Sequence, residues 1–290
     1  MKTPQLYIGT AGWSYKDWVP NFYPKQQSKD FDWLQFYAEY FNIVEVNASY
    51  YTYINQRVVE SWIRKVEFKD DFIFSLKLHQ DFTHKRKFNP AQIKSFTSNL
   101  DLLKDSERLG GLLIQFPYSF DCNDTNIEHL RKLIQIFDGY DKYVEVRHKS
   151  WHNKKAKSIT FCTIDQPQIG EAIPFEPVAG NQKAYLRFHG RNEDAWKESI
   201  GNYGKQQSYD EQNARYKYFY SPGELVEINQ KLKEIYDKVK KVFVIMNNHP
   251  QADAVANAFE LMSLLQDNIK INMPKTITDT HPRLKDFAKN

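Results

Sequence analysis

Two stretches decide the fold, Ile43-Val44-Glu45-Val46-Asn47 and Val144-Glu145-Val146-Arg147, because in each of them valine alternates with a polar or charged residue. Alternation with a period of two is typical of a β-strand, whose successive side chains point to opposite faces. The valines of each stretch would therefore meet covering helices, while the polar side chains point to the other face. This pattern predicts a barrel with helices outside and polar groups inside.

The rest of the chain repeats the strand-helix order around these two stretches. Short β-branched or aromatic runs alternate with segments of helical period, which predicts parallel βα units. We expect eight strands, at Leu6–Ala11, Ile43–Ala48, Phe72–Leu78, Gly111–Phe116, Tyr143–Arg147, Thr160–Ile164, Ala184–Phe188 and Val242–Met246. We expect helices at Phe31–Phe41, Gln56–Val66, Pro90–Ser106, Asn126–Phe137, Gly223–Val239 and Ala252–Leu265, with little helical signal after strands five and six. The prediction is an α/β fold, a (β/α)8 TIM-like barrel forming a single domain over residues 1–290.

One long connection interrupts this order after strand seven, from Arg191 to Tyr220. Connections of that length in a compact barrel are more often functional than idle, and the loops that follow the strands carry the active site. We therefore expect this segment to act as a lid.

Composition excludes several classes of protein. Forty Lys and Arg against 36 Asp and Glu give a net charge of +4, too mild an excess to indicate a nucleic-acid binder by itself. No apolar run is long enough for a transmembrane helix, and the first residues lack the apolar stretch of a secretory signal, so no membrane association is expected. Cys122 and Cys162 have no metal or redox spacing, and we expect two reduced, buried thiols in a cytoplasmic protein.

Alternation along the strands also selects the candidate site. Inward-facing residues near the strand ends face the mouth of a barrel, and a hydrophobic interior would not need polar ones there. The catalytic candidates are Glu45 and Glu145 as an acid/base pair, with His189 as the alternate. The substrate-binding candidates are Asn47, Lys77, Gln115, Arg147, His148, Trp151, Asp165, Arg187, Asn247 and Asn248.

Within this set, Lys77, Arg147 and Arg187 are suited to hold a phosphate or a carboxylate. The sequence therefore favours an enzyme acting on a polar, anionic small molecule, such as a phosphorylated or carboxylated sugar. A closed salt-bridge network that merely fills the upper barrel is the structural alternative.

Two further alternatives remain open. Glu45, His79, Glu145, Asp165 and His189 are residue types that bind divalent metal ions, as a metal-dependent phosphoesterase or isomerase would require. Against a metal, the same region carries three cationic side chains, so no cofactor is expected. The other alternative is a non-catalytic or repair-related protein that binds single-stranded nucleic acid. It would use basic residues in the loops at 84–87 and 148–157, with Trp13, Trp18, Tyr50, Tyr51, Trp151 and Trp196.

Taken together, the motifs resemble one family. They are Gly9-Thr10-Ala11-Gly12-Trp13-Ser14-Tyr15, Glu45-Val46-Asn47-Ala48-Ser49-Tyr50-Tyr51, Leu113-Ile114-Gln115-Phe116-Pro117, Val144-Glu145-Val146-Arg147-His148-Lys149-Ser150-Trp151, Tyr185-Leu186-Arg187-Phe188-His189-Gly190 and Asn247-Asn248-His249. The chain resembles the YecE-like family, a domain of unknown function (72), from Ile8 to about Leu265. The resemblance implies a TIM-like barrel and supplies no reaction. Ala11 and Ala48-Ser49 depart from the family's usual residues, and neither departure removes a charged candidate.

Overall fold

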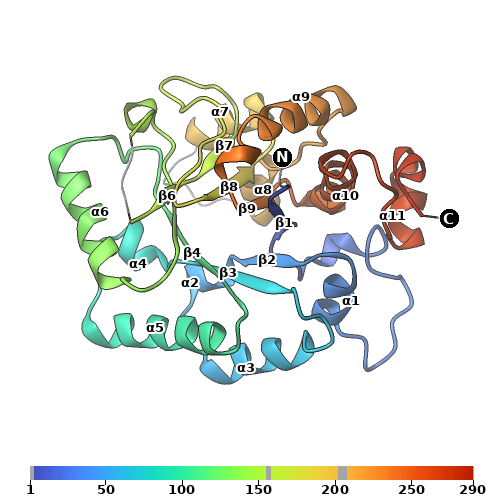
Figure 1. Cartoon of the computed structure of the whole chain (residues 1–290), viewed down its shortest axis with the longest axis horizontal. Coiled ribbons are helices and arrows are strands. Elements are labelled where there is room, and N and C mark those ends of the chain that lie inside the picture. Colours follow the sequence, from blue (N-terminus) through green and yellow to red (C-terminus); the bar gives the residue numbers. More distant parts are fainter. Residues whose placement is uncertain (1–2, 155–157, 202–207, 290) are drawn as a thin grey trace.

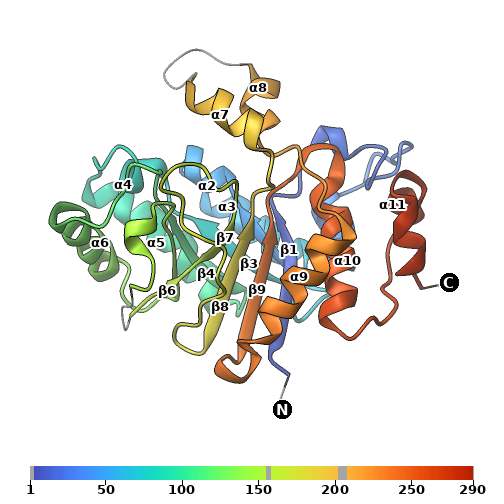
Figure 2. The ribbon, with the colours of Figure 1, turned by 90° about the horizontal axis from the view of Figure 1, so that it is seen from above.

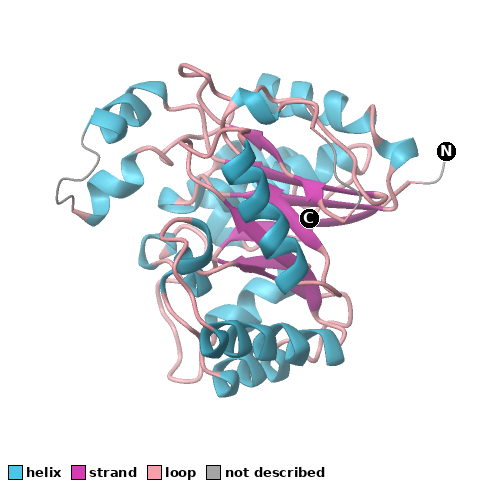
Figure 3. Cartoon of the chain, turned by 90° about the vertical axis from the view of Figure 1, so that its left-hand side faces the viewer, coloured by secondary structure: helices cyan, strands magenta, loops and turns pink. Residues whose placement is uncertain are grey.

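A computed structural model describes residues 3–154, 158–201 and 208–289 of the chain (Figure 1). Parallel strands form a nearly closed barrel, and helices surround it (Figures 1 and 3). The strands are β1 (Gln5–Ala11), β2 (Ile43–Val46), β3 (Ile73–Lys77), β4 (Leu109–Gln115), β5 (Lys142–Glu145), β6 (Thr160–Phe161), β7 (Thr163–Asp165), β8 (Lys183–Phe188) and β9 (Lys241–Met246). The predicted TIM-like barrel of the α/β class is confirmed.

The sheet differs from the prediction at its sixth strand. The stretch predicted as one strand is two, β6 and β7, separated by Cys162. The first half pairs with β5, in the register Tyr143 to Thr160, while the second half pairs with β8, in the register Thr163 to Leu186. One short stretch therefore joins the two ends of the sheet, whose order is β6-β5-β4-β3-β2-β1-β9-β8-β7.

Six longer helices cover the outside of the barrel close to their predicted positions. They are α1 (Trp33–Tyr40), α3 (Gln56–Lys65), α5 (Pro90–Asp105), α6 (Asp124–Ile136), α9 (Pro222–Lys233) and α10 (Asp253–Leu265). The helix α5 begins at Pro90 as predicted, and α9 begins at Pro222, one residue before its predicted start; Asn89 and Ser221 form capping boxes ahead of a proline in the two helices. None of the described helices has both the length and the apolar character needed to cross a bilayer.

The other described helices occupy the connections and the C-terminal end. They are α2 (Ala48–Tyr51), α4 (Gln80–Thr83), α7 (Glu193–Gly201), α8 (Tyr209–Ala214) and α11 (Lys275–Thr280), with 3-10 helices at Lys16–Trp18, Lys149–Trp151, Tyr236–Lys238, Pro250–Ala252 and Pro282–Asp286. The described residues between β5 and β6 form only the 3-10 helix Lys149–Trp151, and residues 166–182 between β7 and β8 form no helix. This agrees with the weak helical signal of both connections.

The two faces of the strands form two separate cores, as the alternation predicts. Val44, Val46, Val144 and Val146 pack with the helices in the outer core. The barrel interior holds an aromatic layer in which Tyr7 stacks on Phe243 and Tyr143 stacks on Tyr185, with ring centroids 5.1 and 4.3 Å apart. This layer is the apolar floor beneath the polar residues of the strand ends.

The two cysteines are both free thiols, in different surroundings. Cys162 is buried in the interior core, as expected. The expectation of burial is wrong for Cys122, which is only half-buried, because it lies in the loop between β4 and α6 rather than in a strand.

Candidate functional site

A buried ion pair crosses the barrel above the aromatic floor. Glu45 of β2 accepts two hydrogen bonds from Arg187 of β8: Oε2 from Nε at 2.9 Å and Oε1 from Nη2 at 2.6 Å. The Tyr185 hydroxyl donates to the same Oε2 at 2.9 Å, and all three side chains are buried. This two-pronged arrangement is the strongest geometry that an arginine and a carboxylate can adopt.

Glu145 of β5 extends this pair into a network. Its Oε2 accepts from Nη1 of Arg187 and lies 3.3 Å from Nε2 of His189, while its Oε1 accepts from Nε and Nη2 of Arg147 at 3.0 and 2.7 Å. Burial alone would raise the pKa of Glu145, yet the guanidinium groups of Arg187 and Arg147 hold that pKa well below its ordinary value. Glu145 is therefore a carboxylate whose two oxygens are both occupied.

Three histidines near the mouth, His84, His189 and His249, have pKa values well below 7. Burial lowers the pKa of His189 to about 3, and its Nδ1 lies 2.9 Å from the side-chain nitrogen of Asn247. Burial, together with nearby cations such as Lys77 for His84 and Arg215 for His249, lowers the pKa of each of these two histidines to about 4. The positive charge of the site therefore comes from lysine and arginine.

Lys77, at the end of β3, carries a cation that the network does not neutralise. Its side chain is partly exposed, and its Nζ lies over the Tyr50 ring, 4.4 Å from the centroid. In the described ranges of the chain, no carboxylate comes within ion-pair distance, 4.0 Å, of this Nζ. Burial, and then the charge of Arg187, lower the pKa of Lys77 to about 7; Arg147 acts in the same direction, and Glu45 and Glu145 oppose it.

The segment predicted as a lid lies over the mouth where its residues are described. Figure 2 shows α7 and α8 beyond the ends of the strands, on the side opposite the N-terminus. Trp196 of α7 covers Arg147, whose guanidinium carbon is 5.2 Å from the ring centroid. Tyr216 is 6.3 Å from the rings of both Trp196 and His189. Residues 202–207 of the segment lie outside the described part of the chain, and a lid motion stays a prediction.

Three predicted polar residues join the rim of this cluster. Asn47 directly follows β2 and is half-buried, and its Oδ1 is buried without a hydrogen-bond partner in the part of the chain that the structure describes. Gln115 ends β4 and donates from Nε2 to the backbone oxygen of Phe116 at 2.8 Å. Asn247 directly follows β9 and contacts His189. Asn47 thus offers an acceptor that is not yet used.

Four other candidates have structural partners of their own. Asp165 accepts from Arg191 Nη2 at 2.6 Å and from the Tyr220 hydroxyl at 2.7 Å, and Asn248 donates to Asn257 at 2.9 Å. His148 caps the 3-10 helix at Lys149, with its Nδ1 2.8 Å from Ser150 Oγ, and the buried indole of Trp151 donates to the backbone oxygen of Phe120 at 2.7 Å. The hydrogen bonds of these four side chains bind loops and helices together beside the charged network.

The five side chains considered as metal ligands are not gathered at one point. His79 stacks on Tyr53, with centroids 4.1 Å apart, and pairs with Asp81 at 3.2 Å, while Asp165 pairs with Arg191. Among the residues that the structure describes, no group of three or more His, Cys, Asp or Glu side chains could hold a metal ion.

The basic loops and the aromatic residues considered for nucleic-acid binding are partly engaged. Lys85 pairs with Asp81 at 3.0 Å and Lys149 with Glu171 at 2.6 Å, while residues 155–157 of the second loop lie outside the described residues. Trp18 and Trp151 are buried in the outer core, whereas Tyr51 is 71% exposed.

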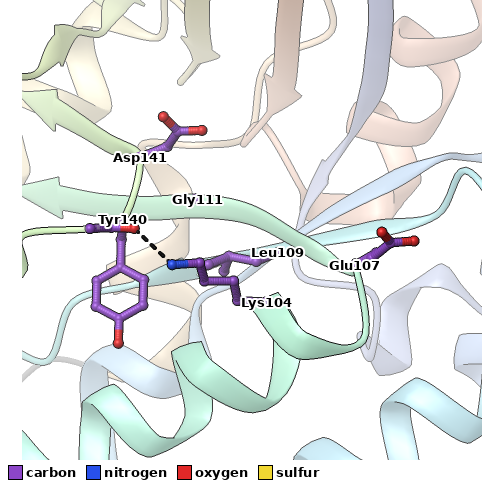
Figure 4. A pocket seen from close by; sticks show the side chains of 7 residues that line it. Lys104, Glu107, Leu109, Gly111, Tyr140 and Asp141 are labelled. Atoms are coloured by element: carbon purple, nitrogen blue, oxygen red, sulfur yellow. Dashed lines mark hydrogen bonds between the residues drawn. The ribbon is translucent and has the colours of Figure 1, made fainter.

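Two hollows lie away from the charged network. One, of about 330 Å³, is lined at the strand starts by residues that include Lys104, Leu109 and Asp141 (Figure 4). Residues at this end of a TIM barrel usually serve stability. The other, of about 470 Å³, lies beside β6 and β7 and is mostly apolar. Neither is lined by Glu45, Lys77, Arg147, Arg187 or His189. We take the network as the candidate site because of its charges.

Several residues of the site were not among the predicted ones. Tyr185 lies two residues before Arg187 on the same strand, so the alternation that selected Arg187 also indicated an inward Tyr185. Trp196 and His84 were noted only as a loop aromatic and as part of a basic cluster. Tyr216 carried no signal, because its contact with His189 depends on how the long connection folds back.

Comparisons with known proteins agree with the fold. Residues 7–281 match the family model described as "Protein of unknown function DUF72". UPF0759 protein YunF of Bacillus subtilis (strain 168) is 32% identical over 278 residues, covering 90% of this chain and 94% of YunF. UPF0759 protein YecE of Escherichia coli (strain K12) is 27% identical over 152 residues, 51% of each chain.

Solved structures of DUF72 proteins share the fold. The crystal structure of a DUF72 family protein from Thermotoga maritima MSB8 matches with a TM-score of 0.77 at 30% identity, covering 90% of this chain and 99% of that one. One from Enterococcus faecalis V583 matches with a TM-score of 0.74 at 22% identity, covering 90% and 96%.

Proposed function

Since the chain belongs to the DUF72 family, whose description states no activity, we propose a function from the site residues: an enzyme that binds a small anionic molecule at the mouth of the barrel. Lys77 and Arg147 would hold the anionic group, and Trp196 and Tyr216 would cover it. The class of ligand is a phosphate ester or a carboxylate of a small polar molecule.

The balance of charge carries this proposal. Arg147, Arg187 and Lys77 can supply three positive charges, whereas Glu45 and Glu145 supply two negative ones. Because charges held away from water need partners, the surplus cation favours an anionic ligand. Lys77 is partly exposed and its ammonium has no carboxylate partner within the described residues, so it is the cation most able to take that ligand.

The two glutamates have a different role in this proposal from the acid/base pair expected from the sequence. Glu45 accepts hydrogen bonds from Arg187 and Tyr185, and both oxygens of Glu145 accept from guanidinium groups. A general base needs a lone pair directed at the proton that it removes. We therefore assign Glu45 and Glu145 as counterions that orient Arg147 and Arg187, and His189 as a neutral spacer between Glu145 and Asn247.

Isothermal titration calorimetry with inorganic phosphate, followed by sugar phosphates and hydroxycarboxylates, tests the proposal. Arg147→Lys keeps a positive charge beside Glu145 but loses the planar fork, so it should weaken binding about tenfold or more. Lys77→Gln should weaken it similarly by removing the surplus charge.

Lys69→Gln is the matched control, since Lys69 precedes β3 at the opposite end of the barrel and its Nζ is 3.5 Å from a backbone oxygen of Glu39. The control should bind as the unmodified protein does. Equal affinities for all three variants, or no measurable binding of any anion at low ionic strength, would overturn the proposal.

A further inference from the structure

The amine of Lys77 differs from that of another lysine on the inner strands. Lys142, at the start of β5, is buried, and its Nζ donates to the backbone oxygens of Phe137 and Tyr140 at 3.0 and 2.9 Å. The Nζ of Lys77 instead lies over the Tyr50 ring, and in the described chain no backbone or carboxylate acceptor is within hydrogen-bond distance of it. The Nζ of Lys77 is therefore not held by hydrogen bonds to backbone or carboxylate oxygens, as the Nζ of Lys142 is.

The groups around Lys77 favour its uncharged form. Burial acts most strongly, and the charges of Arg187 on β8 and Arg147 after β5 act in the same direction, against the opposing effect of Glu45 and Glu145, whose oxygens accept hydrogen bonds from the two arginines. With a pKa of about 7, roughly half of the Lys77 side chains carry a free amine at neutral pH, against less than about one in a thousand for an ordinary lysine. Free amines in such surroundings are nucleophiles.

A small molecule with a carbonyl group and an anionic group would match two features of the site, the amine of Lys77 and the guanidinium of Arg147. One N–H group of Arg147 is available to bind an anion. The Nε and Nη2 atoms of Arg147 donate to Glu145, whereas its Nη1 has no hydrogen bond within the described residues. An anion held there would lie at the mouth of the barrel, where Lys77 ends β3 and Arg147 follows β5.

We infer that Lys77 is a nucleophile that forms an imine with the carbonyl group of a small oxo acid or phosphorylated carbonyl compound, held by Arg147 at the mouth of the barrel. This inference rests on the proposed anion site and adds its substrate class. The Nζ lone pair attacks the carbonyl carbon to give a carbinolamine. Its oxygen then leaves as water with two hydrogens, and a carbon-nitrogen double bond forms. No oxidant or reductant is consumed.

Reductive trapping of the full chain tests this step. The protein is incubated near pH 7 with glyoxylate, pyruvate or pyridoxal 5′-phosphate and sodium cyanoborohydride, and the modified lysines are identified by peptide mass spectrometry. We expect Lys77 to be modified about tenfold or more faster than exposed lysines, because of its larger free-amine fraction. Excess inorganic phosphate should slow this modification, and pyridoxal without its phosphate should react more slowly.

Controls are available within the same chain. Lys69 and Lys142 also have lowered pKa values because of burial, but they lie away from the charged network and should stay unmodified. Lys77→Arg should remove the fast adduct, and a thermal melt shows whether that variant is folded. If the Lys77→Arg variant is not folded, the test is made on the protein without substitutions. Slower modification of Lys77 in the presence of phosphate then supports the proposal.

The outcomes separate the two proposals. Phosphate binding without an adduct at Lys77, or modification spread evenly over exposed lysines, would overturn the imine. Modification of Lys77 at equal rates by pyridoxal and by its phosphate ester would support the nucleophile and contradict the anion site.

Discussion

Replacing Arg187 with methionine should strongly destabilise the protein. The methionine side chain fills a comparable volume but supplies none of the N–H donors that Arg187 directs at Glu45 and Glu145. Glu145 would keep Arg147 and His189, whereas Glu45 would keep only the Tyr185 hydroxyl. The substitution therefore leaves one buried carboxylate, that of Glu45, without a cationic partner, rather than two.

The expected cost follows from that count. Removing one partner of a buried ion pair typically costs about 3–5 kcal/mol of unfolding free energy. For a chain of this length, with an unfolding entropy of about 2 cal/mol/K per residue, this corresponds to a melting temperature lower by about 5–8 °C.

Urea titration and thermal melts of a double-mutant cycle measure this effect. In Arg187→Met, the second change Glu45→Gln removes the stranded charge and should recover part of the lost stability, although Glu45→Gln alone should destabilise the unmodified protein. A cost below about 1 kcal/mol for Arg187→Met, or no recovery in the double variant, would contradict the network as a charge-matched unit.

Four further results are expected. Because the pKa of Glu145 is held below its unfolded value, its stabilising effect is present above about pH 4.3 and is lost as the pH falls further; urea titrations at pH 7 and pH 3.5 should show a smaller acid loss in Glu145→Gln. Asp165→Asn weakens the contacts with Arg191 and Tyr220 and should lower the free energy of unfolding, measured in melts, by about 1–3 kcal/mol. A parallel fall in phosphate affinity would show that Asp165 is part of the anion site. Sulfate affinity measured by calorimetry should fall between pH 6 and pH 8, because Lys77, with a pKa of about 7, loses its charge while sulfate keeps its own; a flat profile would exclude Lys77 as the binding cation. Single-stranded oligonucleotides titrated across a salt series decide the nucleic-acid alternative, which predicts steep salt dependence and loses its support if no binding occurs at low salt.

Alternation along the strands made much of the site predictable. A strand fixes the face of every second residue, so placing Val44 and Val46 against the helices required Glu45 to point inward. The same argument placed Glu145, Arg187 and Lys77 correctly. The identity of the partners did not follow from it, because pairing across a barrel depends on the register of strands that are distant in sequence.

Alternation predicts less where the strands end. Cys162 and Ile164 fill the interior, so the neighbouring Asp165 points to the other face, where Arg191 reaches it. His148 and Trp151 follow β5 in a turn whose direction no period fixes, and Trp151 turned into the outer core. Trp196 reached Arg147 through a connection that has little regular pattern of its own.

The closure of the barrel gives this protein an uneven distribution of local stability. On one side it is sealed by two short strands, β6 with two residues and β7 with three, and no α-helix lies among the described residues of the adjoining connections. Few neighbouring hydrogen bonds protect the backbone amides there, and a mostly apolar hollow of about 470 Å³ lies beside these strands. Opening at this seam would separate β5 from β8, the strands that carry Glu145 and Arg187. We expect this seam to open more readily than the rest of the sheet, and it adjoins the ion pairs on which the site depends.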